Sequence, residues 1–179
     1  MVSKNINIYK LTKKGRTAAL SGIHTADFSL SEEILGTVNL KTFATMMHYE
    51  QERIKSNATL SSNIVVLYFE NIFDLYRAFG KSKEKDLLSE FIHIIRSNIT
   101  PADFICVNNP SVISICMNDV TIEDTKFLVM KMTDMIEELV MNNFDRFEIG
   151  ISSVAVPISK DQQFDKQLQM LIKELVEKS

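Results

Sequence analysis

Runs of apolar and polar residues alternate along the chain with periods that predict a series of helices and strands. Residues 64–69 form a continuous apolar run rich in β-branched side chains, which is typical of a central strand covered on both faces. A helix is expected before this strand, from Asn39 as its N-cap to about Lys55. After the strand, a helical pattern ends at Gly80, and a second helix with a broad apolar stripe covers about 83–98.

The second half of the chain has the pattern of a hairpin, a long helix, a strand and a closing helix. The expected bounds are strands at 104–107 and 112–117, a helix from Thr121 as N-cap to about Asn142, a strand at 147–156 and a helix at 165–177. The core of this order is the β-α-β-β-α-β split motif, which predicts an α+β, ferredoxin-like fold with a palm-type antiparallel sheet and helices on one face. Because this fold hosts many activities, it predicts no function by itself.

The chain divides into a short lead-in and one folded domain. We interpret residues 1–30 as an N-terminal lead-in segment that forms at most a short strand or hairpin, and residues 31–179 as the domain. The first sixteen residues are basic, and no acidic residue precedes Asp27. A solvated extension is the preferred interpretation of this basic segment, and an arm that binds nucleic acid is the alternative.

Charge and composition exclude some classes of protein. The net charge of −3 gives no general reason to expect nucleic acid as a partner. No apolar stretch approaches the roughly 18 residues of a membrane span, and the start of the chain lacks the apolar core of a signal peptide. We therefore expect a cytoplasmic protein without membrane insertion. We prefer two buried thiols, which agree with that compartment, to a disulfide or a metal site. The expected hairpin register places Cys106 opposite Ile113 and Cys116 opposite Asp103, so the cysteines are not cross-strand partners.

Several local patterns, taken in order, resemble the GGDEF family of bacterial diguanylate cyclase domains. Residues 32–43 follow the spacing of the segment that opens those domains and retain Gly36, Asn39 and Phe43. Three further matches are the Phe79-Gly80-Lys81 step, Asp103 ahead of the hairpin, and the closing strand at 149–155. The resemblance covers 31–178 and implies the family's fold.

The same resemblance shows what the chain has lost. The signature motif falls on the Asn-Pro-Ser-Val-Ile sequence at 109–113, which retains none of its residues, and the metal-binding aspartate of the first strand falls on Tyr68. The guanine-reading asparagine falls on Tyr76, and the aspartate that shares its task falls on Lys85. The arginine of the inhibitory product site falls on Thr100. The resemblance therefore implies a degenerate domain, a pseudo-enzyme.

The residues at these positions are poorly suited to nucleotide chemistry. Joining two nucleoside triphosphates requires a divalent cation, which carboxylates and the substrate phosphates hold. The neutral phenol of Tyr68, with a reference pKa of about 10, is a poor ligand. Pro110 can neither take the left-handed conformation that a glycine turn allows nor donate an N–H to phosphate. Glu70 is interpreted as a strand-end acid facing solvent, with a metal ligand of a divergent cyclase as the alternative.

We expect no catalytic residue, no metal ligand and no cofactor. The residues that could line a vestigial cleft, or a surface for a partner or ligand, are Tyr68, Glu70, Tyr76, Asn108, Asn109 and Ser111. One expected helix also carries four methionines, for which core filling is the preferred interpretation and an adaptable partner surface the alternative: Met130, Met132, Met135 and Met141.

The resemblance implies a function in signalling rather than in catalysis. We expect a catalytically inactive GGDEF-like domain that acts as a protein-interaction, scaffolding or regulatory module in bacterial cyclic-di-GMP or motility signalling. The alternative is a sensor that binds GTP or cyclic-di-GMP without turning it over, and the lesser alternative is a divergent nucleotidyl cyclase. The expected partner is a protein whose identity the sequence does not specify. A homodimer stays open, whereas nucleotide and nucleic acid are not expected partners.

Overall fold

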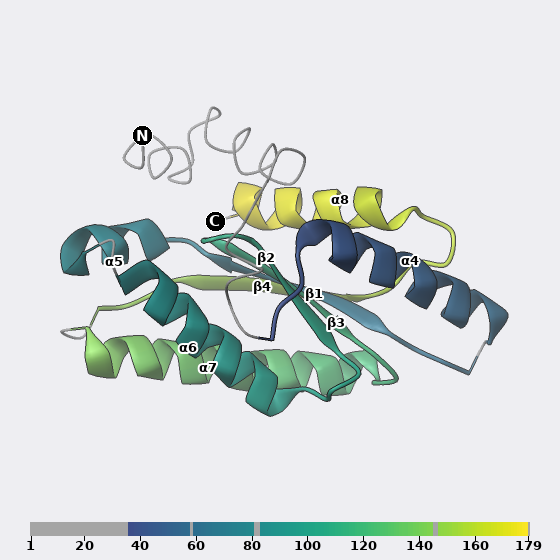
Figure 1. The fold of residues 1–179 in the computed structure, drawn as a ribbon, viewed down its shortest axis with the longest axis horizontal. Helices are drawn as coiled ribbons and strands as arrows, with labels where there is room; N and C mark the ends of the chain where they lie inside the picture. Colours follow the sequence, from purple (N-terminus) through teal and green to yellow (C-terminus); the bar gives the residue numbers. More distant parts are fainter. Residues whose placement is uncertain (1–35, 58, 81–82, 145–146, 179) are drawn as a thin grey trace.

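An antiparallel sheet lies at the centre of the molecule, with helices on both sides (Figure 1). The computed structural model describes residues 36–178 except 58, 81–82 and 145–146. Within these residues the sheet has four strands in the order β2-β3-β1-β4. The elements are α4 (Leu40–Ser56), β1 (Asn63–Phe69), α5 (Ile72–Phe79), α6 (Lys83–Asn98), β2 (Phe104–Asn109), β3 (Val112–Met117), α7 (Ile122–Asn143), β4 (Ile151–Pro157) and α8 (Phe164–Lys178). The α+β fold and the order of these elements are as predicted.

Strand β1 is the central strand, as its apolar run predicts. It pairs with β3 on one side and β4 on the other, so that Val65 lies opposite both Ile115 and Ala155. All seven residues of β1 are buried. Alternate side chains point to opposite faces of a strand, and each apolar side chain removed from water contributes about 1.5–3 kcal/mol. A strand of this kind is stable only where both of its faces are covered.

The helices cover both faces of the sheet rather than one. Val65, Leu67 and Phe69 pack with α5, α6 and α7, which is the side expected for the helices of the split motif. Ile64, Val66 and Tyr68 point the other way and pack with α4 and α8 (Figure 1). The expectation of helices on one face therefore holds only for the inner part of the motif. The flanking helices close the second face because β1 is apolar on both sides.

The helix ends follow the capping signals in the sequence. The Asn39 side chain accepts a hydrogen bond from the backbone N–H of Thr42 at 2.8 Å, and the Thr121 hydroxyl accepts one from the N–H of Asp124 at 3.1 Å. A cap of this kind stabilises a helix by about 1 kcal/mol. Gly80 ends α5 with a φ of 98°, a conformation that favours glycine. The predicted positions of these caps are confirmed.

The hairpin register differs from the prediction by one residue. Cys106 lies opposite Ser114, not Ile113, and Cys116 lies opposite Phe104, not Asp103. The cause is a bulge between Val107 and Asn109, which moves the turn to Pro110-Ser111. The cysteines are still not directly opposite each other, and both are buried free thiols. Burial raises the pKa of the Cys106 thiol to about 12, so the reactive thiolate is disfavoured at neutral pH.

Two other expectations concern the ends of the chain and the membrane. The lead-in expected at 1–30, with its strand or hairpin and its basic residues, lies outside the described residues. No described helix combines the length and apolar character needed to cross a membrane.

Candidate functional site

The end of β1 lies next to the hairpin turn and the start of β4. The backbone N–H of Phe69 donates to the carbonyl of Ser111 at 2.9 Å, and the N–H of Glu70 donates to the carbonyl of Gly150 at 2.9 Å. These bonds bring together three segments that are far apart in the sequence. We call the part formed by Tyr68, Asn108, Asn109, Pro110 and Ser111 the hairpin end.

The hairpin turn is closed by its own side chains. Asn109 Oδ1 accepts hydrogen bonds from both the backbone N–H of Ser111, at 2.9 Å, and its hydroxyl, at 2.7 Å. Asn108 Oδ1 accepts one from the Ser114 hydroxyl at 2.6 Å. Asn108 and Asn109 are 1% and 3% exposed, and their Nδ2 groups have no hydrogen-bond partner within the described chain. A buried donor without a partner costs about 1–3 kcal/mol.

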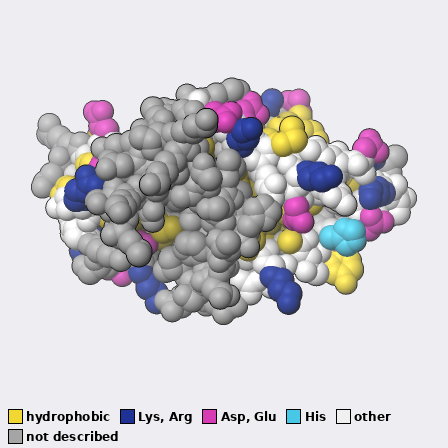
Figure 2. Space-filling model, turned by 90° about the horizontal axis from the view of Figure 1, so that it is seen from above, with side chains coloured by type: hydrophobic (Ala, Val, Ile, Leu, Met, Phe, Trp, Pro, Cys, Tyr) yellow, Lys and Arg dark blue, Asp and Glu magenta, His cyan; other side chains and the backbone are white. Residues whose placement is uncertain are grey.

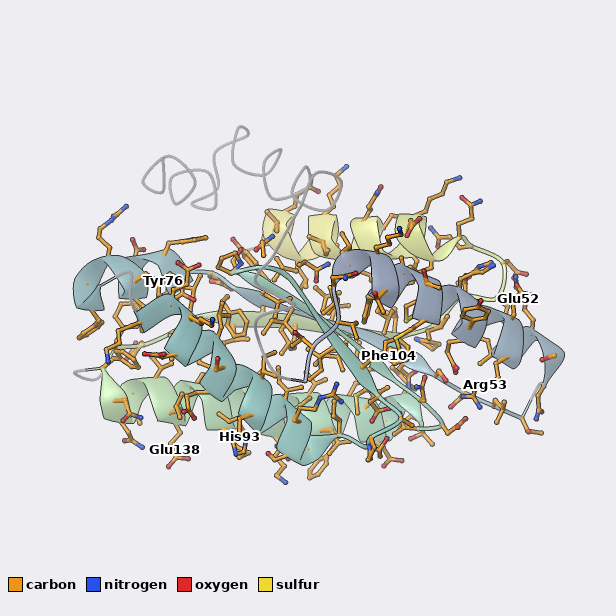
Figure 3. All side chains as sticks on the ribbon, viewed as in Figure 1. Glu52, Arg53, Tyr76, His93, Phe104 and Glu138 are labelled. Carbon is orange, nitrogen blue, oxygen red and sulfur yellow. The ribbon has the colours of Figure 1, made fainter. Side chains whose placement is uncertain are left out.

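The two tyrosines of the expected cleft lie on opposite faces of the sheet. Tyr68 is 1% exposed and belongs to the apolar cluster under α4 and α8. Tyr76 lies on α5 in the other cluster (Figure 3), where its ring meets that of Phe73 edge-on with centroids 6.0 Å apart. Burial, and secondarily the charge of Glu84, raises the pKa of the Tyr76 hydroxyl far above its usual value. The tyrosines therefore do not form one aromatic surface.

Glu70 is fastened to β4 instead of facing solvent. Its Oε1 accepts a hydrogen bond from the Ser152 hydroxyl at 2.6 Å. Its Oε2 lies only 3.0 Å from the point where a Cβ on residue 150 would stand, so a side chain there would displace the carboxylate. Asn71 completes the contact, since its Oδ1 accepts from the N–H of Gly150 and its Nδ2 donates to the carbonyl of Glu148, both at 2.8 Å. The glycine just before the last strand was the one local signal for this contact.

Asp103, which the resemblance places ahead of the hairpin, holds the loop before β2 to the segment after β3. Its Oδ2 accepts from the N–H and the hydroxyl of Thr100, at 2.7 and 2.9 Å. Its Oδ1 accepts from the N–H of Asn118 at 2.7 Å. Arg96 donates from Nη1 to the Asp103 carbonyl at 2.8 Å and from Nε to the Gly36 carbonyl at 2.9 Å. Asp103 is 4% exposed, and these bonds occupy both of its carboxylate oxygens.

The GGDEF resemblance implies a divalent cation at the end of β1, and the donors there do not suit one. The phenol of Tyr68 is enclosed in an apolar cluster, and the carboxylate of Glu70 already binds Ser152. The turn offers amides, a proline and a hydroxyl, whereas magnesium prefers carboxylate, phosphate and water oxygens. Among the described residues, no three His, Cys, Asp or Glu side chains gather closely enough to hold a metal ion.

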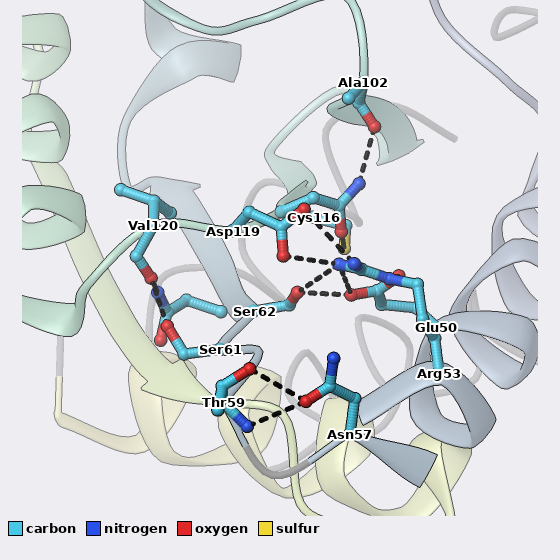
Figure 4. Close-up of polar contacts among 12 residues, drawn as sticks. Glu50, Arg53, Asn57, Thr59, Ser61, Ser62, Ala102, Cys116, Asp119 and Val120 are labelled. Carbon is cyan, nitrogen blue, oxygen red and sulfur yellow. Dashed lines mark hydrogen bonds and ion pairs between the residues drawn. The ribbon is translucent and has the colours of Figure 1, made fainter. Parts of the chain in front are cut away.

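The opposite end of the sheet carries a network of polar side chains whose donors and acceptors are paired (Figure 4). Arg53 binds Glu50 through Nε and Nη2, at 2.8 and 2.7 Å, and Asp119 through Nη2 and Nη1, at 2.8 and 3.2 Å. The Ser62 hydroxyl donates to Glu50 Oε1. These hydrogen bonds, from Glu50 first, raise the pKa of Arg53. We call these four residues the Arg53 network; it joins α4 to the loop between β3 and α7.

Two open grooves lie away from the hairpin end. One, of about 450 Å³, runs between α4 and the loop before α8, and its lining includes His48, Gln51, Lys55, Lys160, Asp161 and Phe164. Figure 2 shows basic and acidic side chains interspersed on this side of the molecule, so the groove favours no one class of ligand. The other groove, of about 440 Å³, lies between α7 and the segment that precedes β4.

Solved structures with similar folds are GGDEF domains. The diguanylate cyclase SiaD of Pseudomonas aeruginosa, solved with its activator SiaC, matches with a TM-score of 0.65 and 12% identity over 98% of this chain. The chain spans 65% of the length of SiaD. The GGDEF domain of FimX from the same organism has a TM-score of 0.63 and 12% identity, over 87% of this chain and 96% of the domain. The GGDEF domain of DgcB from Caulobacter crescentus, in complex with c-di-GMP, has a TM-score of 0.63 and 10% identity. The match covers 83% of this chain and 88% of that domain.

These similarities show a GGDEF-like fold, as the sequence predicts. Identities of this size carry the fold alone. No family model matches the sequence, and no curated protein matches it significantly.

Proposed function

We propose that this chain is a GGDEF-like domain without diguanylate cyclase activity, which acts as a protein-interaction or regulatory module in bacterial cyclic-di-GMP or motility signalling in the cytoplasm. The observation that carries the proposal is the enclosure of Tyr68. This side chain occupies the β1 position that the resemblance assigns to the metal-binding aspartate, and it is 1% exposed in an apolar cluster. A cation brought there would lose its water and gain no anionic ligand, and a buried unpaired charge is strongly disfavoured.

The turn supports the same conclusion for the phosphates. Pro110 has no N–H to donate, and the N–H of Ser111 is already bonded to Asn109. No residue of the turn has a positive φ, so the left-handed backbone of a glycine turn is not formed. A phosphate would have to break bonds that hold the hairpin closed. Among the neighbours, SiaD is a diguanylate cyclase solved with a protein partner, which supports a protein partner for a fold of this kind.

The test is a direct assay of synthesis. The purified full chain is incubated with GTP and either Mg²⁺ or Mn²⁺, and cyclic-di-GMP is quantified by chromatography with mass spectrometry beside an active diguanylate cyclase. We expect no product above the level of a reaction without protein. Product formed by the wild type overturns the proposal, and its loss in Glu70→Gln would identify a divergent cyclase that uses Glu70.

A nucleotide sensor is the second candidate, because the hairpin end holds two unused donors. The Nδ2 groups of Asn108 and Asn109 have no partner among the described residues, and a base or sugar oxygen would satisfy either donor once the turn opened to expose it. Calorimetry with GTP, cyclic-di-GMP and cyclic-di-AMP tests this function. Binding that weakens at least about tenfold in Asn109→Ser, equal to about 1.4 kcal/mol, supports the sensor, and flat titrations at millimolar nucleotide remove it.

A further inference from the structure

The outer side of α7 carries apolar side chains that no described element covers. The buried positions of this helix are Thr125, Val129, Met132, Ile136 and Val140. On the opposite side, Phe127, Met130 and Met141 are 61%, 53% and 47% exposed. Met132 thus fills the core as predicted, whereas Met130, Met135 and Met141 are exposed. Isolated exposed apolar residues are ordinary, but a row of them along one helix indicates an interaction site.

The row has the spacing of a helix-packing seam. Positions 127, 130, 134, 137 and 141 are separated alternately by three and four residues, which is the repeat by which one helix packs along another. The middle of the row is acidic, with Asp134 and Glu137 between the apolar ends. From Phe127 to Met141 the row extends roughly 21 Å at 1.5 Å per residue, which is the length of about four helical turns.

A groove with an acidic rim continues the row at its C-terminal end. Met141, Phe147 and Ile149 form its apolar floor. The rim carries four carboxylates, from Asp134, Glu137, Glu138 and Glu148. Figure 3 shows Glu138 on the outer side of α7. We call these seven residues, with Phe127 and Met130, the α7 outer face.

The carboxylates of this face have no cationic partner among the residues that the structure describes, since no Lys or Arg there forms an ion pair with any of the four. Partial burial, and then the charge of Asp134, raises the pKa of Glu137, which reflects the crowding of negative charge beside an apolar floor. A ligand with both positive charge and apolar surface would pair with the carboxylates and cover the apolar floor.

Charge decides among the possible occupants. A second copy of this chain would set the same carboxylates against one another, which costs several kcal/mol of interaction and disfavours self-association through this face. Anionic lipid and nucleic acid are repelled for the same reason. A helix with lysines or arginines beside an apolar stripe fits, because the aliphatic stems lie on the floor while the charged heads reach the rim.

We propose that the α7 outer face docks a basic amphipathic helix of a partner protein. This proposal rests on the proposed function, since it locates the partner surface of the interaction module. The exposed methionines suit such a helix, because their flexible, polarisable side chains adapt to the apolar surface they meet. A single helix of about four turns covers less than a standard interface, so the contact is expected to be of micromolar rather than nanomolar strength.

The test uses a model helix as the probe. A fluorescein-labelled peptide of about 18 residues, with leucines at seam positions and lysines elsewhere, is titrated with the full chain and followed by anisotropy. A second peptide carries glutamates in place of the lysines. We expect the lysine peptide to bind at micromolar protein, the glutamate peptide to stay free, and the amide NMR shifts caused by the lysine peptide to centre on α7.

Substitutions separate this site from general attraction between opposite charges. The double variant Glu137→Lys with Glu138→Lys should weaken binding at least about tenfold, and Met141→Ser, which changes no charge, about threefold or more. The single variant Glu137→Lys should also weaken binding, whereas Glu52→Lys on α4, on the other face of the sheet, makes the same charge change as that single variant and should leave the affinity within about twofold. Circular dichroism and melting temperature establish that each variant is folded.

Several outcomes overturn the docking proposal. One is an equal loss of peptide affinity in the Glu52→Lys control, and another is a set of amide NMR shifts spread over the whole surface. A third is displacement of the peptide by millimolar Mg²⁺, which would indicate a cation site. The last is a dimer in sedimentation that Met141→Glu abolishes. The result of the cyclase assay is independent of the result of the peptide titration. A chain that makes cyclic-di-GMP and still binds the peptide removes the proposed function alone, and a silent chain that ignores the peptide removes this docking site alone.

Discussion

The two ends of the sheet differ in whether their buried polar groups have hydrogen-bond partners. In the Arg53 network every group of the guanidinium fork and of the Glu50 carboxylate has a partner, and the neighbouring Asn63 Nδ2 donates to both the Val120 carbonyl and the Thr125 hydroxyl. At the hairpin end, Asn108 and Asn109 each keep a buried donor without a described partner. The first end is organised for stability. The second has the unfinished polar pattern that is common where a fold carries a site.

The two ends also differ in how far their bonds reach along the chain. The Arg53 network connects α4 to a loop 66 residues away in the sequence, so a change in any member affects two elements. The hairpin end depends mostly on bonds within its own turn. We infer that substitutions in the turn itself, at residues 108–111, are absorbed locally, and comparisons of variants at the two ends test this contrast.

The largest effect is expected from returning a carboxylate to β1. Tyr68→Asp removes most of a buried aromatic side chain and places an acid in an apolar cluster, so unfolding should become easier by about 4 kcal/mol or more. Tyr68→Phe keeps the volume and should cost about 1 kcal/mol. Urea denaturation measures both. A Tyr68→Asp protein of near wild-type stability would mean that the position is open to water and the enclosure argument is wrong.

The next effect breaks the Arg53 network. Arg53→Ala leaves Glu50, whose side chain is 8% exposed, without its cation. Removing one partner of a fully buried pair costs about 3–5 kcal/mol, and the 36% exposure of Arg53 reduces our expectation to about 2 kcal/mol.

The matched control is Arg77→Ala, whose partner Asp74 is on the same helix and whose own side chain is 53% exposed. It should change the free energy of unfolding by less than about 0.5 kcal/mol. Equal effects in the two variants would show that the network adds nothing beyond a surface ion pair.

A pair of asparagine variants compares the two ends directly. Asn63→Leu breaks two hydrogen bonds and leaves the Thr125 hydroxyl and the Val120 carbonyl short of a donor, which should cost about 2 kcal/mol. Asn108→Leu combined with Ser114→Ala removes both members of a bond together with the orphan Nδ2, so stability should stay within about 0.5 kcal/mol or rise. Thermal melts of both proteins give the comparison, and the reverse ranking would refute the contrast between the ends.

The smallest effect concerns the α7 outer face. Because the folded-state pKa of Glu137 is raised, the folded state holds its proton more tightly, and stability falls as the pH rises from below the ordinary glutamate value through the raised one. Glu137→Gln should therefore be more stable than wild type at pH 7.5 by a few tenths of a kcal/mol, reduced by solvent screening. The difference should vanish near pH 3.5. A variant difference that grows on acidification would contradict the raised pKa.

Most of the fold could be predicted because its signals are local. Asn39 and Thr121 cap helices with bonds that span three residues, and Gly80 ends α5 through its own backbone. The hairpin register was wrong by one residue, because a bulge depends on which side chains find partners across the strands. The apolar run of β1 indicated that both faces of the sheet are covered, but the sequence did not assign α4 and α8 to the second face.

The candidate site was predictable in part. The sequence identified the hairpin and the end of β1 as neighbours, and the structure places Tyr68, Asn108, Asn109 and Ser111 there. The sequence grouped Tyr76 with these residues, whereas the structure places Tyr76 on the opposite face of the sheet from Tyr68. It also missed the contact of Glu70 with Ser152, 82 residues away, and the Arg53 network, because long-range pairs leave no periodic pattern in the sequence.

Gly150 lies so close to the Glu70 side chain that any other residue type at this position would have to displace the carboxylate by a few tenths of an ångström. An alanine at this position would press on the Glu70 carboxylate and loosen it from Ser152. An ion-binding acid at the end of β1 would therefore depend on residue 150 as well as on residue 68. Selection experiments for cyclic-di-GMP synthesis should find the two positions changing together.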